Sequence, residues 1–207
     1  MPTNIIPGPF CNISPIVLAS GSPRRRDFLT SVGLDFTIVP SSFEEPAPEP
    51  DESPEAYASR MATGKANDVA QAHPEACIIA ADSVVAIDNN ILGKPKDEHD
   101  AHRMLRLLSG KQHAVTTGCT LIAPQRKEIS SFAITTKVWF TELSDAIIHA
   151  YIQTKEPMDK AGAYAIQGQG AFMVKKITGS YTNVVGLPLS KIINTLLSWA
   201  VIIPRKS

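Results

Sequence analysis

The chain has 207 residues, 43% of them apolar and 19% charged, with 20 lysines and arginines against 20 aspartates and glutamates. This length suits one substantial domain with a buried core. The absence of net charge disfavours a long nucleic acid or an anionic membrane as partner, so any basic feature is local.

The first fifteen residues contain four prolines and neither lysine nor arginine, which is not the composition of a secretory signal. We therefore expect residues 1–15 to form a loose extension. A single domain over residues 16–203 is expected to follow it.

Residues 16–19 read as a short buried strand, and a helix is predicted from Ser22 as N-cap and Pro23 as first residue to Gly33. Its first turn carries three arginines, Arg24 to Arg26, although cations are disfavoured where free N–H groups already supply positive charge. A bound polyanion would explain them, because a helix start binds anions and guanidinium groups bind phosphate oxygens in pairs. The alternative is that the arginines are solvated or paired with the acidic residues of 44–55.

A second strand is expected over 36–39, followed by an acidic, proline-rich segment over 43–51 that cannot form a regular helix. Ser53 then starts a helix that runs to about His73. Lys65 interrupts the apolar face of this helix, so it is either functional or reaches past the apolar surface to water.

Residues 77–87 are nearly continuous apolar sequence, as in a strand buried on both faces, and only Asp82 and Ser83 break the run. A carboxylate in such a strand is costly unless it has a partner or a function. Asp82 is thus a candidate site residue, or it caps a neighbouring loop. Glu45 is either a second oxygen ligand for Mg²⁺ or a solvated acid, and Lys94 is either a site residue or an ordinary turn lysine.

The remaining sequence alternates helices and strands in irregular order, with two glycine-rich segments between the last elements. We predict helices over 101–110, 144–153 and 189–200, an antiparallel hairpin of 113–123 with 129–140, a strand over 171–177, and glycine-rich segments over 160–170 and 179–188. The fold class is therefore α/β, a mixed twisted sheet with flanking helices in two lobes around a cleft.

Three cysteines, Cys11, Cys77 and Cys119, lie far apart and have no C-x-x-C spacing. This pattern disfavours a zinc site or a disulfide framework and is typical of a reducing compartment, so we expect a cytoplasmic protein. The uncharged run over 192–204 is too short to cross a bilayer and is better explained as the last packed helix. Because two-fold dimers are the commonest oligomers, a homodimer is the expected assembly.

Six segments together resemble one family, the Maf nucleoside triphosphate pyrophosphatases. They are LASGSPRR at 18–25, AADSVV at 80–85, ILGKP at 91–95, LLSGKQHAVTTG at 107–118, DKAGAYAIQGQG at 159–170 and GSYTNVVGLPL at 179–189. The resemblance covers about residues 16–200. It implies a fold like that of inosine triphosphate pyrophosphatases, and cytoplasmic, metal-dependent hydrolysis of a nucleoside triphosphate to the monophosphate and pyrophosphate.

The resemblance also implies roles for individual residues. Asp82 matches the proton acceptor, Arg25, Ser83 and Gln167 match positions associated with base specificity, and Ser20, Arg24, Glu45, Lys65 and Lys94 match residues that line the same pocket. From these we expect Mg²⁺ or Mn²⁺ to be held by Glu45, Asp82 and phosphate oxygens.

The AYAIQG sequence resembles the branch associated with dTTP and UTP. The Gln167 amide could accept from N3–H of uracil or thymine and donate to O4, whereas cytosine presents the opposite pattern. Ser83 stands where the family usually has threonine, a departure that could loosen discrimination. Two alternatives remain open: the same reaction on modified nucleotides, and a nucleotide-sensing module that regulates cell division.

Overall fold

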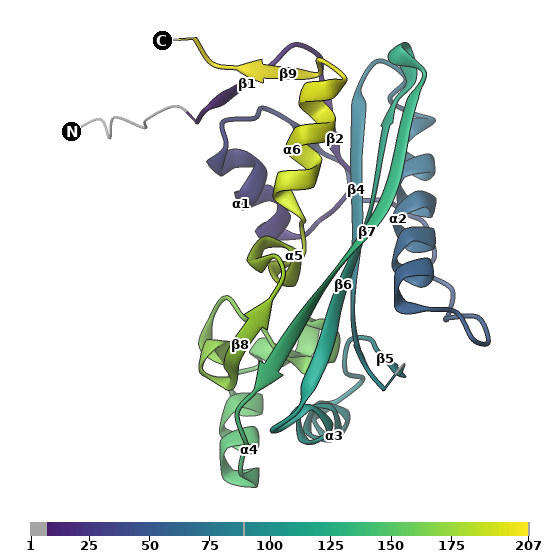
Figure 1. The fold of residues 1–207 in the computed structure, drawn as a ribbon. Coiled ribbons are helices and arrows are strands. Elements are labelled where there is room, and N and C mark those ends of the chain that lie inside the picture. The colour runs from purple at the N-terminus through teal and green to yellow at the C-terminus, as the bar shows by residue number, and fades with distance from the viewer. Residues whose placement is uncertain (1–7, 89, 207) are drawn as a thin grey trace.

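A mixed seven-stranded sheet runs through the computed structural model, which describes residues 8–88 and 90–206 (Figure 1). The strand order is β3-β2-β4-β6-β7-β8, and β5 pairs with β4. β2 is parallel to β3 and β4, and the other pairs are antiparallel. The strands are β2 (Ile16–Leu18), β3 (Thr37–Ile38), β4 (Cys77–Ile87), β5 (Asn90–Leu92), β6 (Gln112–Ala123), β7 (Glu128–Phe140) and β8 (Val174–Thr178).

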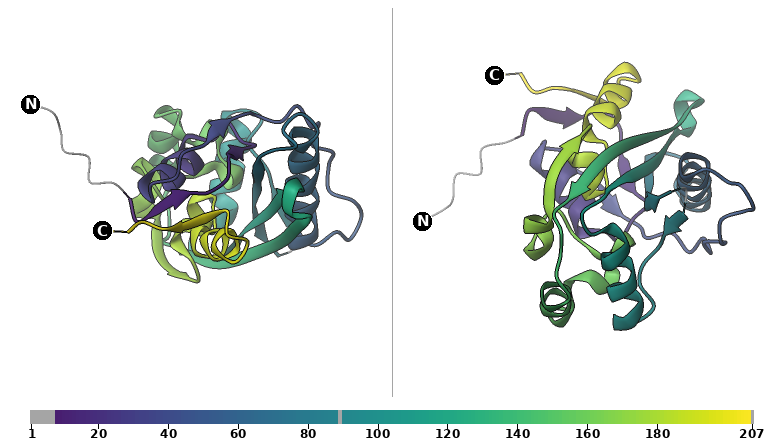
Figure 2. Two further views of the ribbon diagram at one scale, coloured as in Figure 1. Left: turned by 90° about the horizontal axis from the view of Figure 1, so that it is seen from above. Right: turned by 60° about the horizontal axis from the view of Figure 1, so that its bottom comes forward.

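Helices cover both faces of this sheet. Figure 2 shows the long β6–β7 hairpin running between α2, in blue, and α6, in yellow. The helices are α1 (Pro23–Ser31), α2 (Pro54–Ala70), α3 (Glu98–Leu108), α4 (Asp145–Gln153), α5 (Tyr181–Val185) and α6 (Leu189–Ser198). Short 3-10 helices span Pro124–Arg126, Glu156–Asp159, Ala161–Ala163 and Gln169–Met173.

Strand β4 contributes to three hydrophobic cores, one of which joins its Ile78 and Ala80 to α2. The mixed sheet with helices on both faces confirms the α/β prediction. The first half of β4, with Ile79 and Ala81, packs with apolar residues of α1 and α6. Its second half, with Val85 and Ile87, packs with α3 and α4. Only Asp82 and Ser83, at the junction, are not fully buried in this strand.

One edge of β4 is open at the same junction. β2 pairs with β4 as far as Ile79, and β5 pairs from Val85 onward. The other edge pairs continuously with β6. The short neighbours β2 and β5 therefore leave Asp82 and Ser83 at the centre of a stretch that can receive a ligand.

The expectation of a loose extension over 1–15 is wrong for residues 10–12. They form β1 (Phe10–Asn12), which pairs antiparallel with β9 (Ile202–Pro204) and ties the two ends of the chain together. Residues 1–7 lie outside the described part of the chain. The apolar run over 192–204 is not one helix. It divides between α6 and β9, and Ala200, between the two elements, has a left-handed conformation (φ 49°).

The strand expected over 171–177 begins only at Val174. Residues 169–173 form a 3-10 helix instead, because the Glu156 carboxylate accepts hydrogen bonds from the backbone N–H groups of Gln169 and Gly170. In the described ranges no helix has the length and apolar character needed to traverse a bilayer.

Candidate active site

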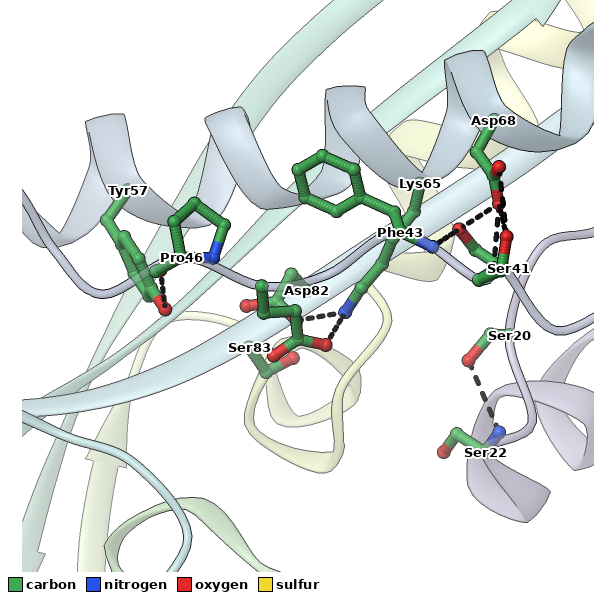
Figure 3. Close-up of polar contacts among 12 residues, drawn as sticks. Ser20, Ser22, Ser41, Phe43, Pro46, Tyr57, Lys65, Asp68, Asp82 and Ser83 are labelled. Carbon is green, nitrogen blue, oxygen red and sulfur yellow. Dashed lines mark hydrogen bonds and ion pairs between the residues drawn. The ribbon is translucent and has the colours of Figure 1, made fainter.

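Asp82 and Ser83 are neighbours in β4, so their side chains point to opposite faces of the sheet. Asp82 faces α2, where its Oδ1 lies 2.6 Å from Lys65 Nζ (Figure 3). Ser83 faces α1, where its hydroxyl accepts a hydrogen bond of 3.2 Å from Arg25. One dipeptide thus connects a carboxylate–lysine pair with the arginines at the start of α1.

Lys65 Nζ lies between two carboxylates. It is 2.6 Å from Glu45 Oε1 as well as 2.6 Å from Asp82 Oδ1. The side chains of Lys65 and Asp82 are each 13% exposed, whereas that of Glu45 is 51% exposed. The lysine that interrupts the apolar face of α2 therefore pairs with two carboxylates and does not extend to bulk water.

Arg25 is the inward-facing member of the arginine triplet. Its guanidinium donates to Gly186 O at 2.8 Å, to Ser20 Oγ at 3.0 Å and to Ser83 Oγ. Burial holds the pKa of Arg25 below its usual value, and the nearby Asp82 carboxylate opposes that effect. The side chain nevertheless remains a cation at any working pH.

The other two arginines differ in environment. Arg26 is exposed and pairs with Asp27 at 3.0 Å. Arg24 has a buried Nε with no hydrogen-bond partner among the described residues. Within residues 8–88 and 90–206, none of the three pairs with the acidic residues of 44–55, so the acidic-pairing alternative does not hold there.

A polar chain behind Ser83 was not predicted from the sequence. Ser83 Oγ lies 2.8 Å from Thr117 Oγ1, which donates to the backbone oxygen of Asn183. The buried Asn183 amide donates to Val115 O and to Thr136 Oγ1, both at 3.0 Å. Thr117 and Asn183 lie in the VTTG and YTNVVG motifs, and these motifs are the sequence features from which the two residues could have been singled out.

The structure does not bring Lys94 and Gln167 into this network. Both are exposed, and in the described chain neither makes a hydrogen bond or ion pair with the residues above. Ser20 does belong to it, because its hydroxyl also accepts from the Ser22 backbone N–H at 3.2 Å.

Glu45 and Asp82 supply oxygen ligands of the kind that a divalent cation takes. Two carboxylates converge on one point, the Lys65 ammonium. The described ranges hold no group of three or more His, Cys, Asp or Glu arranged for a metal. A hard cation such as Mg²⁺ commonly takes one or two protein carboxylates and completes its shell with phosphate oxygens and water.

A helix start that carries three arginines, beside two carboxylates and a lysine, belongs to a class of site suited to phosphorylated ligands. The profile described as Maf-like protein matches residues 15–199, so the chain belongs to the Maf family.

Similar proteins carry a shared name. A "dTTP/UTP pyrophosphatase" of Desulfotalea psychrophila is 46% identical over 91% of this chain and 96% of its own. Another of that name, from Oleidesulfovibrio alaskensis, is 46% identical over 96% of this chain and 91% of its own. A crystal structure of a nucleoside-triphosphatase, or dITP/XTP pyrophosphatase, of Mycobacterium abscessus aligns with 16% identity and a TM-score of 0.42, over 87% of this chain and 93% of that one.

Proposed function

We propose that this protein is a nucleoside triphosphate pyrophosphatase that hydrolyses dTTP and UTP to the monophosphate and pyrophosphate with Mg²⁺ or Mn²⁺. The observation that carries the proposal is the placement of Lys65 Nζ 2.6 Å from both Asp82 and Glu45. Cations that bind phosphate oxygens and carboxylates that bind a metal are both required for a magnesium–triphosphate complex. The names of the curated relatives support the choice of substrate.

The triphosphate binds to the start of α1 and to nearby cations. Ser20 approaches it from the loop before α1, and Arg24 and Arg25 from the first turn of α1, where backbone N–H groups add to the positive potential. The unpartnered Nε of Arg24 supports this role, because a buried donor without a partner is costly unless a ligand accepts its hydrogen bond. Lys65 and Lys94 neutralise the remaining phosphate charge.

Asp82 accepts the proton of the water that attacks the α-phosphorus. Lys65 contacts Oδ1, so Oδ2 is the oxygen left for that proton. Attack forms one bond from water to the α-phosphorus, and the bond to the bridging oxygen of pyrophosphate breaks. Glu45 and Asp82 would hold the metal together with phosphate oxygens, and the ion, when bound, would supply charge neutralisation and alignment.

Base recognition is assigned to Arg25, Ser83 and Gln167. The contact between Arg25 and Ser83 supports a shared role for these two residues. Gln167 is exposed in the segment between α4 and β8. Its amide would accept from N3–H and donate to O4 of a uracil or thymine. A CTP substrate would leave these groups unpaired.

The proposal includes a location in the cytoplasm, which is a reducing compartment, and assembly as a homodimer. Burial raises the pKa of Cys77 and of Cys119 to about 12, so both remain protonated thiols. Cys11, Cys77 and Cys119 are all free, which supports a cytoplasmic location. Light scattering in solution tests the homodimer.

Pyrophosphate release from dTTP, UTP, CTP, GTP and 7-methyl-GTP, with Mg²⁺, Mn²⁺ or chelator, tests the reaction. We expect metal-dependent release that is fastest with dTTP and UTP. Fastest release from a modified nucleotide would favour the modified-substrate alternative. Tight nucleotide binding without release would favour the sensor of cell division.

The variant Asp82→Asn should nearly abolish release without unfolding the protein. Asp88→Asn is the matched control, since Asp88 is an exposed residue just beyond the same strand with φ 49°, which asparagine tolerates. Near-normal turnover by the Asp82 variant would contradict the assignment.

A further inference from the structure

The segment that carries Glu45 lies along α2 without forming a helix or strand. We define it as the acidic strap, residues 41–52. Its prolines prevent regular structure. Figure 3 shows it following α2, with Phe43, Pro46 and Ser41 in contact with that helix. The strap is nevertheless anchored on both sides of Glu45.

Asp68 provides the first anchor. One oxygen of its carboxylate accepts hydrogen bonds from Ser41 Oγ at 2.7 Å and from the Ser42 backbone N–H at 2.8 Å. The Ser42 hydroxyl lies 3.2 Å from the other oxygen. Ser41 Oγ in turn accepts from the Phe43 backbone N–H at 3.0 Å. One side chain of α2 thus fixes three consecutive residues of the strap.

The Phe43 ring then packs directly on the backbone of α2 at Gly64. A Cβ added to Gly64 would lie 2.4 to 2.6 Å from three atoms of this ring. Only glycine allows so close an approach. Gly64 immediately precedes Lys65, so the anchored part of the strap ends beside the lysine that contacts Glu45.

A second set of contacts holds the strap after Glu45. Tyr57 donates to Pro46 O at 3.1 Å, and Arg60 donates to Ala47 O at 3.3 Å. Arg60 also forms a two-bond pair with Glu52, at 2.8 and 2.6 Å. Burial raises the pKa of Tyr57, and the charges of Asp82 and Glu45 raise it further.

Glu45 itself is half exposed, and among the residues that the structure describes it makes one ion pair, with Lys65. An ion pair at such a position is too weak to order a twelve-residue segment. The position of the Glu45 carboxylate therefore depends on the anchors around it.

We propose that Asp68 is a positioning residue of the active site: through Ser41, Ser42 and Phe43 it holds the Glu45 carboxylate at Lys65 and Asp82. The expected effect of Asp68 on catalysis rests on the proposed function. The structural part of the inference, the dependence of the Glu45–Lys65 contact on Asp68, stands independently of the reaction.

The test compares Asp68→Ala, Glu45→Gln and the double variant in the full-length protein. Alanine keeps the helix propensity of α2. Asp145→Ala is the matched control, because Asp145 is also a helix carboxylate that accepts from neighbouring side chains, Arg106 and His102, between α3 and α4. Folding is checked by circular dichroism and a thermal melt.

The first readout is the rate of acylation of Lys65, measured by mass spectrometry without nucleotide. Loss of the Glu45 carboxylate removes one of the two groups that contact the Lys65 ammonium, so Glu45→Gln should raise the rate. Asp68→Ala should raise it similarly, and the double variant should add nothing further. A wild-type rate in Asp68→Ala, with Glu45→Gln raised, would overturn the proposal.

The second readout is pyrophosphate release. We expect Asp68→Ala to lower kcat by about 10- to 100-fold, as misplacement of a site group by about 1 Å does. The double variant should be no slower than Glu45→Gln alone. A structural effect unrelated to Glu45 would instead lower kcat of the double variant by the product of the two single effects. If the wild-type protein releases no pyrophosphate, the proposed function fails, and the acylation result alone decides the role of Asp68.

Discussion

A methyl group added at Gly118 tests how the packing of α2 supports the site. Gly118 is the β6 residue paired with Asp82, and α2 crosses the sheet on top of it. A Cβ built there would lie 2.3 Å from the backbone C and O of Ala58. Lys65 is two turns further along the same helix, so a displacement of α2 reaches the Lys65–Asp82 contact.

The size of the displacement follows from the contact distance. Ordinary van der Waals contact of a Cβ begins at 3.4 Å, so Gly118→Ala requires a movement of roughly 1 Å. Overpacking of this kind costs about 1–3 kcal/mol of unfolding free energy. A shift of about 1 Å would also lengthen the Lys65–Asp82 contact of 2.6 Å beyond hydrogen-bond range. We expect a loss of kcat of about 100-fold.

Denaturant unfolding and steady-state pyrophosphate release measure these two effects. Gly93→Ala is the control for stability, since a Cβ at Gly93 meets nothing within 4 Å. Gly118→Ala should be destabilised relative to both the wild type and this control. A Gly118→Ala variant with wild-type stability and turnover would refute the packing argument.

Two further predictions concern buried polar groups. Burial lowers the pKa of His113 from 6.5 to about 4, so the unfolded chain binds a proton first as the pH falls. The neutral His113 side chain contributes its full stabilisation above about pH 6.5, and about 3 kcal/mol of unfolding free energy is lost as the pH falls toward 4. His113→Gln should therefore weaken the dependence of the unfolding free energy on pH across this window. Lys65→Met leaves two carboxylates without their shared cation and should lower pyrophosphate release by at least about 100-fold. An unchanged pH dependence or an active Lys65 variant would contradict the respective argument.

The long elements were predictable because their signals are local. The apolar run of β4, broken only by two polar residues, indicated both the buried strand and the place of the candidate site. The spacing of α2 singled out Lys65, and proline ruled out a helix in the strap. Each of these patterns reflects the burial of one face or the chemistry of one residue type.

What could not be predicted depends on contacts between distant residues. Three consecutive arginines turn through three directions on a helix, and the sequence does not say that Arg25 is the one facing Ser83. Arg25 also donates to the backbone oxygen of Gly186, a contact that no residue type in the sequence indicates. The β1–β9 pair joins opposite ends of the chain without a local signal. The anchors of the strap likewise lie on a different element from the strap itself.

Hydrolysis of dTTP in water enriched in ¹⁸O tests the central claim, that water attacks the α-phosphorus. Mass spectrometry of the products shows which phosphorus was attacked. The proposed mechanism predicts one labelled oxygen in the thymidine monophosphate and none in pyrophosphate. Label in pyrophosphate, or release of labelled orthophosphate, would contradict attack at the α-phosphorus.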